Sequence, residues 1–143
     1  MCTLVFIAAD HPLATIAWNP AKPAFHVREL TDQEHLIRGR FSKPYVYYVG
    51  AHELCGCGFR YGLPPEQLLL EPEEEVAARD SVRRLAAYLT ALVAVDIVEL
   101  YACASEELRD VSAAPSARAP LSVSTIGGET FSLVEGKLLT IAA

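Results

Sequence analysis

The chain has 143 residues, the usual size of one domain. Its 52% hydrophobic and 21% charged residues exclude an intrinsically disordered protein, and four cysteines are too few for a disulfide-dense miniprotein. The formal net charge of −6 argues against the basic surface that binds nucleic acid or an anionic membrane, so we expect neither as a partner.

The N-terminal half of the chain is predicted to contain two strong strands. Residues 3–9 are apolar and β-branched without a polar break, which is typical of a strand in the centre of a sheet. A short strand is expected over 25–30, after which Thr31 and Glu34 match a capping box and predict a short helix. Aromatic and β-branched residues over 44–50 predict the second strong strand.

The clearest predicted element is a long helix over about 72–94. Pro72 suits the first turn of a helix, and the three glutamates that follow it complement the positive end of the helix dipole. Apolar residues recur at helical spacing and form one face: Val82, Leu85, Ala86, Leu89, Leu92 and Val93. A third strong strand is predicted over 97–104, directly after this helix.

The C-terminal part of the chain is predicted to be rich in strands. Residues 112–120 are rich in Ser, Ala and Pro and are expected to form a flexible internal loop. Strands are expected over 121–126, 130–134 and 137–141, and the Glu135-Gly136 pair between the last two fits a two-residue turn. The C-terminus is therefore predicted to form an antiparallel hairpin.

The order of these elements predicts the fold class. The strand–helix–strand segment over 44–104 predicts a βαβ unit, that is, a parallel pair of strands with a right-handed crossover. Together with the hairpin, it predicts a single domain over 1–143, with a mixed sheet covered by one long helix. The class is α/β or α+β, depending on the pairing order, and an exposed strand could support a homo-oligomer.

Residues with reactive side chains gather in one loop, whose sequence over 52–58 is HELCGCG. The thiols of Cys55 and Cys57 and the imidazole of His52 can each act as a metal ligand, a nucleophile or a proton carrier. Gly56 and Gly58 remove side-chain bulk, which lets both sulfurs turn toward a common point. The loop is the first candidate for a functional site.

A metal site, for zinc or another transition metal, is one interpretation of this loop, although the sequence does not specify the cofactor. His52, Cys55 and Cys57 would supply three ligands, and either His11 or Cys103 would supply the fourth or the fourth position would stay open. If the three strong strands are parallel, all five residues lie at the carboxyl edge of the sheet, where open α/β folds place their sites.

Thiol chemistry and a structural role are two other interpretations of the loop. Cys55 and Cys57 are close enough in sequence to form a strained, reversible disulfide, and His52 and Glu53 could act as acid and base beside them. In the structural interpretation the glycines shape a tight turn and the cysteines pack as small apolar side chains.

Cys2 offers a second possible nucleophile. Met1-Cys2 at the start of a buried strand resembles the opening of the N-terminal-nucleophile amidohydrolases. The resemblance implies removal of Met1, attack by the Cys2 thiol, and the free α-amine as its base. It also implies a sheet sandwich larger than this chain.

The sequence favours a small non-catalytic binding or accessory protein without an assignable activity. The alternative is a metal- or thiol-dependent enzyme centred on the loop of His52, Cys55 and Cys57, and a third possibility is a hydrolase with Cys2 as nucleophile. A cytoplasmic location is expected because no basic residue precedes the first apolar stretch, as a secretory signal requires. The sequence specifies no small-molecule ligand.

Overall fold

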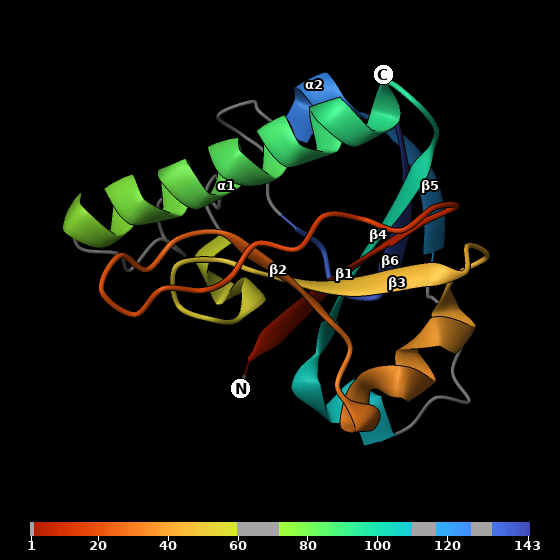
Figure 1. Ribbon diagram of the computed structural model, residues 1–143, viewed down its shortest axis with the longest axis horizontal. Helices are drawn as coiled ribbons and strands as arrows, with labels where there is room; N and C mark the ends of the chain where they lie inside the picture. The colour runs from red at the N-terminus through yellow and green to blue at the C-terminus, as the bar shows by residue number, and fades with distance from the viewer. Residues whose placement is uncertain (1, 60–71, 110–116, 127–132) are drawn as a thin grey trace.

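A mixed six-stranded sheet lies at the centre of the computed structural model, which describes residues 2–59, 72–109, 117–126 and 133–143 (Figure 1). The strands are β1 (Thr3–Ala9), β2 (His26–Glu29), β3 (Tyr45–Gly50), β4 (Val98–Ala104), β5 (Ala117–Ser122) and β6 (Lys137–Ala142). Their order across the sheet is β2-β3-β1-β4-β6-β5. The predicted class, one domain with a mixed sheet and a long helix, is confirmed.

Helices cover both faces of this sheet. The long helix α1 (Pro72–Val93) and the short α2 (Val123–Ile126) lie on one side, whereas the 3-10 helices η1 (Asp32–Arg40) and η4 (Ser105–Arg109) lie on the other (Figure 1). A further 3-10 helix, η2 (Gly56–Phe59), contacts both α1 and β1. Among the described residues, no helix combines the length and apolar character needed to cross a membrane.

Strand β1 occupies the centre of the sheet, as its unbroken apolar sequence predicts. It pairs antiparallel with β3 on one side and with β4 on the other. Strands β3 and β4 therefore run in the same direction within one sheet and are connected through α1, as the predicted βαβ unit requires, but they are not neighbours and do not pair with each other. The physical reason is that β1, buried on both faces, takes the position between them.

The C-terminal strands pair differently from the predicted hairpin. Strand β6 is antiparallel to β4 and parallel to β5, so both of its edges are occupied and no hairpin partner can join it. Of the expected strand over 130–134, residues 130–132 lie outside the described residues, and Leu133 and Val134 lie in no strand. The predicted loop over 112–120 is also corrected, because 117–120 belong to β5, while 112–116 lie outside the described residues. Of the strand expected over 121–126, residues 121 and 122 belong to β5, but 123–126 form the short helix α2.

The core is divided by the sheet into two clusters. On β1, Val5 and Ile7 pack with Leu85 and Leu89 of α1. The alternate β1 residues, with Phe6 as the largest, face the other side and pack with the following residues of η1, β3 and β4: Ile37, Tyr48, Tyr101 and Cys103. This alternation along one strand is what a sheet covered on both faces requires. Both faces of the central strand are thus held by apolar contacts.

His26 is the buried histidine of the sheet. It is 3% exposed at the start of β2, and its ring lies 6.5 Å from that of Trp18 and 5.9 Å from that of Tyr48. Burial lowers the pKa of His26, and the positive charge of Arg28 lowers it further, although hydrogen bonds to backbone groups oppose this. The folded protein therefore favours the neutral imidazole.

We expect the free energy of unfolding to decrease as the pH falls below 6.5, the ordinary pKa of histidine. Below that pH the unfolded chain binds a proton that the folded His26 rejects, so stability rises with pH between the folded and unfolded pKa values. The slope is at most about 1.4 kcal/mol per pH unit. Urea unfolding measured from neutral to mildly acidic pH should show a flatter dependence for His26→Gln, and equal slopes would contradict this assignment.

Candidate metal centre

The loop after β3 is closed by hydrogen bonds that bring Cys55 back toward the sheet. Leu54 N donates to Ala51 O at 3.2 Å, and Ala51 N donates to Cys55 O at 3.0 Å. Leu54 has a φ of 72°, in the left-handed region that non-glycine residues rarely adopt. The Tyr48 hydroxyl donates to Leu54 O at 2.6 Å and so holds this strained residue in place.

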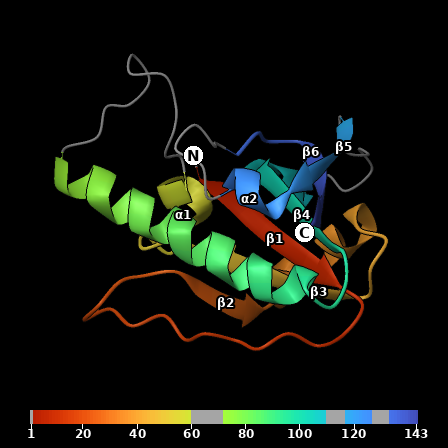
Figure 2. The same ribbon diagram turned by 90° about the horizontal axis from the view of Figure 1, so that it is seen from above.

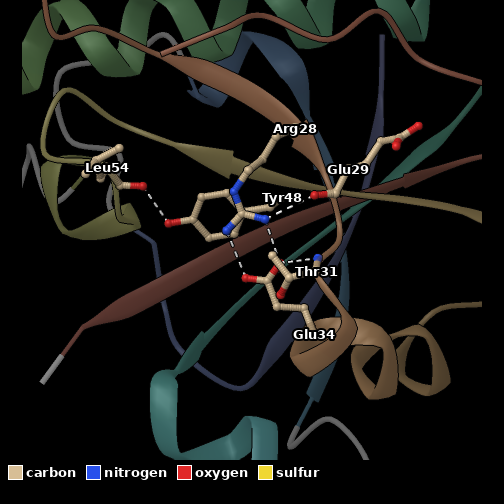
Figure 3. Close-up of polar contacts among 6 residues, drawn as sticks. All are labelled: Arg28, Glu29, Thr31, Glu34, Tyr48 and Leu54. Carbon is tan, nitrogen blue, oxygen red and sulfur yellow. Dashed lines mark hydrogen bonds and ion pairs between the residues drawn. The ribbon is translucent and has the colours of Figure 1, made fainter. Parts of the chain in front are cut away.

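Tyr48 packs against the Arg28 side chain, which an ion pair with Glu34 holds in place (Figure 3). The Arg28 guanidinium lies 3.9 Å from the centre of the Tyr48 ring and donates two hydrogen bonds to Glu34, at 2.6 and 3.0 Å. The Glu34 carboxylate also accepts from Thr31 N at 3.0 Å, as the predicted capping box requires. Burial alone would raise the pKa of Glu34, but these bonds outweigh it and lower the pKa. The turn before Cys55 is therefore supported by ordered side chains.

The glycines of the loop allow η2 to approach the start of β1 (Figure 2). A Cβ on Gly56 would lie 2.4 Å from Val5 Cγ2 and 3.0 Å from Thr3 O, so a larger residue does not fit there. At this close approach Thr3 N donates a hydrogen bond to Cys57 Sγ at 3.3 Å. The absence of a side chain at Gly56 therefore lets the cysteine loop lie against the start of β1.

Three cysteines converge where these segments meet. The sulfurs of Cys2, Cys55 and Cys57 all lie within 4.8 Å of one another, with Cys2 exposed and the other two half-buried. With a Zn–S distance of about 2.3 Å, the sulfurs around one tetrahedral ion lie about 3.8 Å apart. The group could therefore hold a metal ion after small side-chain movements.

Sequence reasoning treated Cys2 only as a nucleophile and missed its place in this group. Because β1 is antiparallel to β3, the start of β1 lies at the edge of the sheet where β3 ends. The expectation of parallel strands, which placed His11 beside the loop, is wrong for the same reason. His11 follows the far end of β1, at the opposite edge. The signal for Cys2 was its position one residue before the predicted central strand.

His52 and Glu53 lie close to the cysteines in sequence but outside the three-cysteine group. His52 Nδ1 lies 2.9 Å from the hydroxyl of Ser81, a buried residue of α1, and His52 N donates to the same oxygen. The exposed Glu53 carboxylate lies 3.8 Å from His52 Nε2. In this arrangement the histidine ties the loop to α1 instead of facing the thiols.

Cys103 is packed in the core and is not part of the group either. It is fully buried in the cluster on the η1 side of the sheet, opposite Leu4 in the register of β4 with β1. Burial, with the nearby negative charges of Glu107 and Glu135, raises the pKa of Cys103 to about 12. It behaves as a small apolar side chain, as buried free cysteines commonly do.

The electrostatics of the group disfavour a free thiolate at Cys55. Burial is the largest cause that raises the pKa of this thiol to about 12, and the Cys57 and Cys2 thiols add to it. A thiol with so high a pKa is protonated at neutral pH and is a weak nucleophile. A bound cation reverses this balance, because its charge favours the deprotonated ligand.

The thiol group does not line the two surface hollows formed by described residues. A hollow of about 570 Å³ is lined by Leu54, residues 15–18 and β2, and none of the three cysteines contributes to it. The N-terminal-nucleophile resemblance implied a sandwich of sheets, whereas the described residues form one sheet. Because no cysteine of the group lines these hollows, the chemistry of the site depends on the three thiols themselves.

Comparison of this chain with protein-family models, with curated proteins and with solved structures finds no match. No relative therefore supplies a function by analogy. A function for this chain rests instead on the geometry and chemistry of its described residues.

Proposed function

We propose that this protein is a non-catalytic metal-binding protein that holds one thiophilic ion through Cys2, Cys55 and Cys57, with Zn²⁺ as the preferred ion. The observation that carries the proposal is the convergence of three sulfurs, from the start of β1 and the loop after β3, within 4.8 Å. Soft thiolate donors select zinc, copper(I) and iron–sulfur clusters. The short distances between the sulfurs favour a single ion over a cluster.

Two further observations support binding over catalysis. His52, the nearest candidate for a general base in sequence, is hydrogen-bonded to Ser81 and stands outside the thiol group. The raised pKa of Cys55 disfavours a free thiolate nucleophile. The proposal includes a reducing compartment such as the cytoplasm, where cysteines persist as the free thiols seen here.

Metal analysis of protein purified without a chelator tests this proposal. We expect about one equivalent of zinc per chain, as the geometry of a three-thiolate centre requires. Replacement of any one of the three cysteines by serine should weaken zinc binding by more than about 100-fold, beyond the loss typical of an outer-shell partner. Cys103→Ala is the matched control, because it removes the thiol outside the group and should keep the metal.

Three outcomes would contradict the proposal. Protein that carries no metal and binds neither zinc nor copper(I) on titration has no such site. Equal metal loss in Cys103→Ala and in Cys57→Ser would show that the effect comes from a general loss of structure. A loss of two free thiols under mild oxidation, without metal binding, would support a reversible disulfide of Cys55 and Cys57 instead.

A further inference from the structure

We propose that the three-cysteine centre leaves one coordination position of its metal open and that an external thiolate fills it. This inference rests on the proposed function, since it concerns the same ion. It adds the chemical class of a ligand, a thiol from a second molecule, to the donors that the chain supplies.

The first argument is that the described part of the chain offers no further thiolate or imidazole ligand to the site. All four cysteines and all four histidines lie among the described residues, and only Cys2, Cys55 and Cys57 form the group. The remaining ones are placed elsewhere: Cys103 in the core, His11 at the opposite edge, His26 between aromatic rings, His35 against Arg38, and His52 on Ser81. A closed site of four thiolate or imidazole ligands therefore does not form in this arrangement.

The second argument is the access to the site. Zinc sites with three protein ligands keep a fourth position for water or for a reacting molecule, whereas structural sites have four protein ligands. Cys2 is exposed, so the group is open to solvent at the start of β1. An external ligand can reach the ion there without a rearrangement of the sheet.

The third argument is the softness of the donors. The Glu135 carboxylate, which accepts a hydrogen bond from the Thr3 hydroxyl at 2.7 Å, is the hard alternative beside the start of β1. A soft metal centre prefers sulfur over such an oxygen. On binding, the external thiol loses its S–H proton to solvent, an S–metal bond forms and a water molecule leaves the ion, so no oxidant or reductant is needed.

Cobalt(II), which takes tetrahedral thiolate sites and has visible absorption, serves as the probe for this inference. Addition of 2-mercaptoethanol to the Co²⁺-loaded protein should shift and intensify the ligand-field bands, with saturation at one thiol per cobalt. Ethylene glycol, the oxygen analogue, is the matched control and should leave the spectrum unchanged. If a short cysteine peptide binds ten times more tightly than 2-mercaptoethanol, the external thiolate comes from a protein cysteine. If 2-mercaptoethanol binds more tightly, the external thiolate comes from a small thiol.

The failures of the two proposals are distinguishable. If no thiolate-to-cobalt charge-transfer band forms, there is no metal site, and the proposed function fails with the inference. If the band forms but added thiol leaves the ligand-field bands unchanged, only the inference is overturned. A Glu135→Gln variant whose Co²⁺ spectrum differs before thiol is added would also overturn it, because Glu135 would then be the fourth ligand.

Discussion

Replacing Gly50 with alanine is expected to lower the free energy of unfolding by about 3 kcal/mol, the upper end of the range for overpacking a core. The new Cβ would lie 2.1 Å from His26 Cε1 and 2.4 Å from Leu54 O. Neither neighbour can move freely: the His26 ring is packed against Trp18 and Tyr48, and the Leu54 carbonyl accepts the Tyr48 hydroxyl. The substitution therefore forces either the buried ring or the loop backbone out of place.

Gly39→Ala is the matched control for this experiment. No atom lies within 4 Å of a Cβ built on Gly39, so its stability should stay within about 0.5 kcal/mol of the parent protein. Urea unfolding followed by far-ultraviolet circular dichroism measures both variants. If the Gly50→Ala protein is as stable as the Gly39→Ala protein, the loop does not pack closely against β2.

Replacing Glu99 with alanine is expected to cost about 4 kcal/mol, because bonds to a charged acceptor contribute about 1.5–3 kcal/mol each. Glu99 is 4% exposed on β4. Its carboxylate accepts hydrogen bonds from Ser42 N at 2.9 Å, Ser42 Oγ at 3.0 Å and Lys43 N at 3.1 Å. Alanine would leave these donors without their acceptor and release the segment between η1 and β3.

Two graded variants separate the carboxylate from its surroundings. Glu99→Gln keeps one acceptor oxygen and should lose about half as much stability, while Ser42→Ala removes only the hydroxyl donor and should cost about 1 kcal/mol. Chemical denaturation gives all three values on one scale. If Glu99→Ala cost no more than Ser42→Ala, the carboxylate would not be the acceptor that fixes this segment.

Local features of the fold are the ones that the sequence predicts. The long helix α1, the central position of β1 and the Thr31–Glu34 cap each follow from a pattern within a few neighbouring residues. The pairing of β3, β4 and β6 does not follow from such a local pattern, because it depends on which strands, distant in the sequence, come together. Pairing with β6 also explains why 117–120 form a strand, although proline and small residues give that segment little intrinsic preference for one.

In the candidate site, too, the sequence predicts the part that is local along the chain and not the part that depends on strand pairing. Cys55, Cys57 and their glycines are visible as a local cluster, and the structure keeps the two cysteines together. The third member, Cys2, joins them only because β1 runs antiparallel to β3, a fact about the sheet rather than the loop. His52 lies between the strand and the cysteines in sequence, yet its partner Ser81 comes from α1, which sequence spacing does not reveal.

The hydrogen bond from Thr3 N to Cys57 Sγ joins residues 54 positions apart, and an ion held by Cys2, Cys55 and Cys57 would cross-link the chain over nearly the same span. A cross-link that closes a loop of this length removes roughly 4 kcal/mol of conformational freedom from the unfolded chain. Because β1 pairs with both β3 and β4, fixing Cys2, the residue directly before β1, would restrain the middle of the sheet. The metal would then act as a reversible cross-link between β1 and the loop after β3. Its removal would lower the cooperativity with which the sheet unfolds.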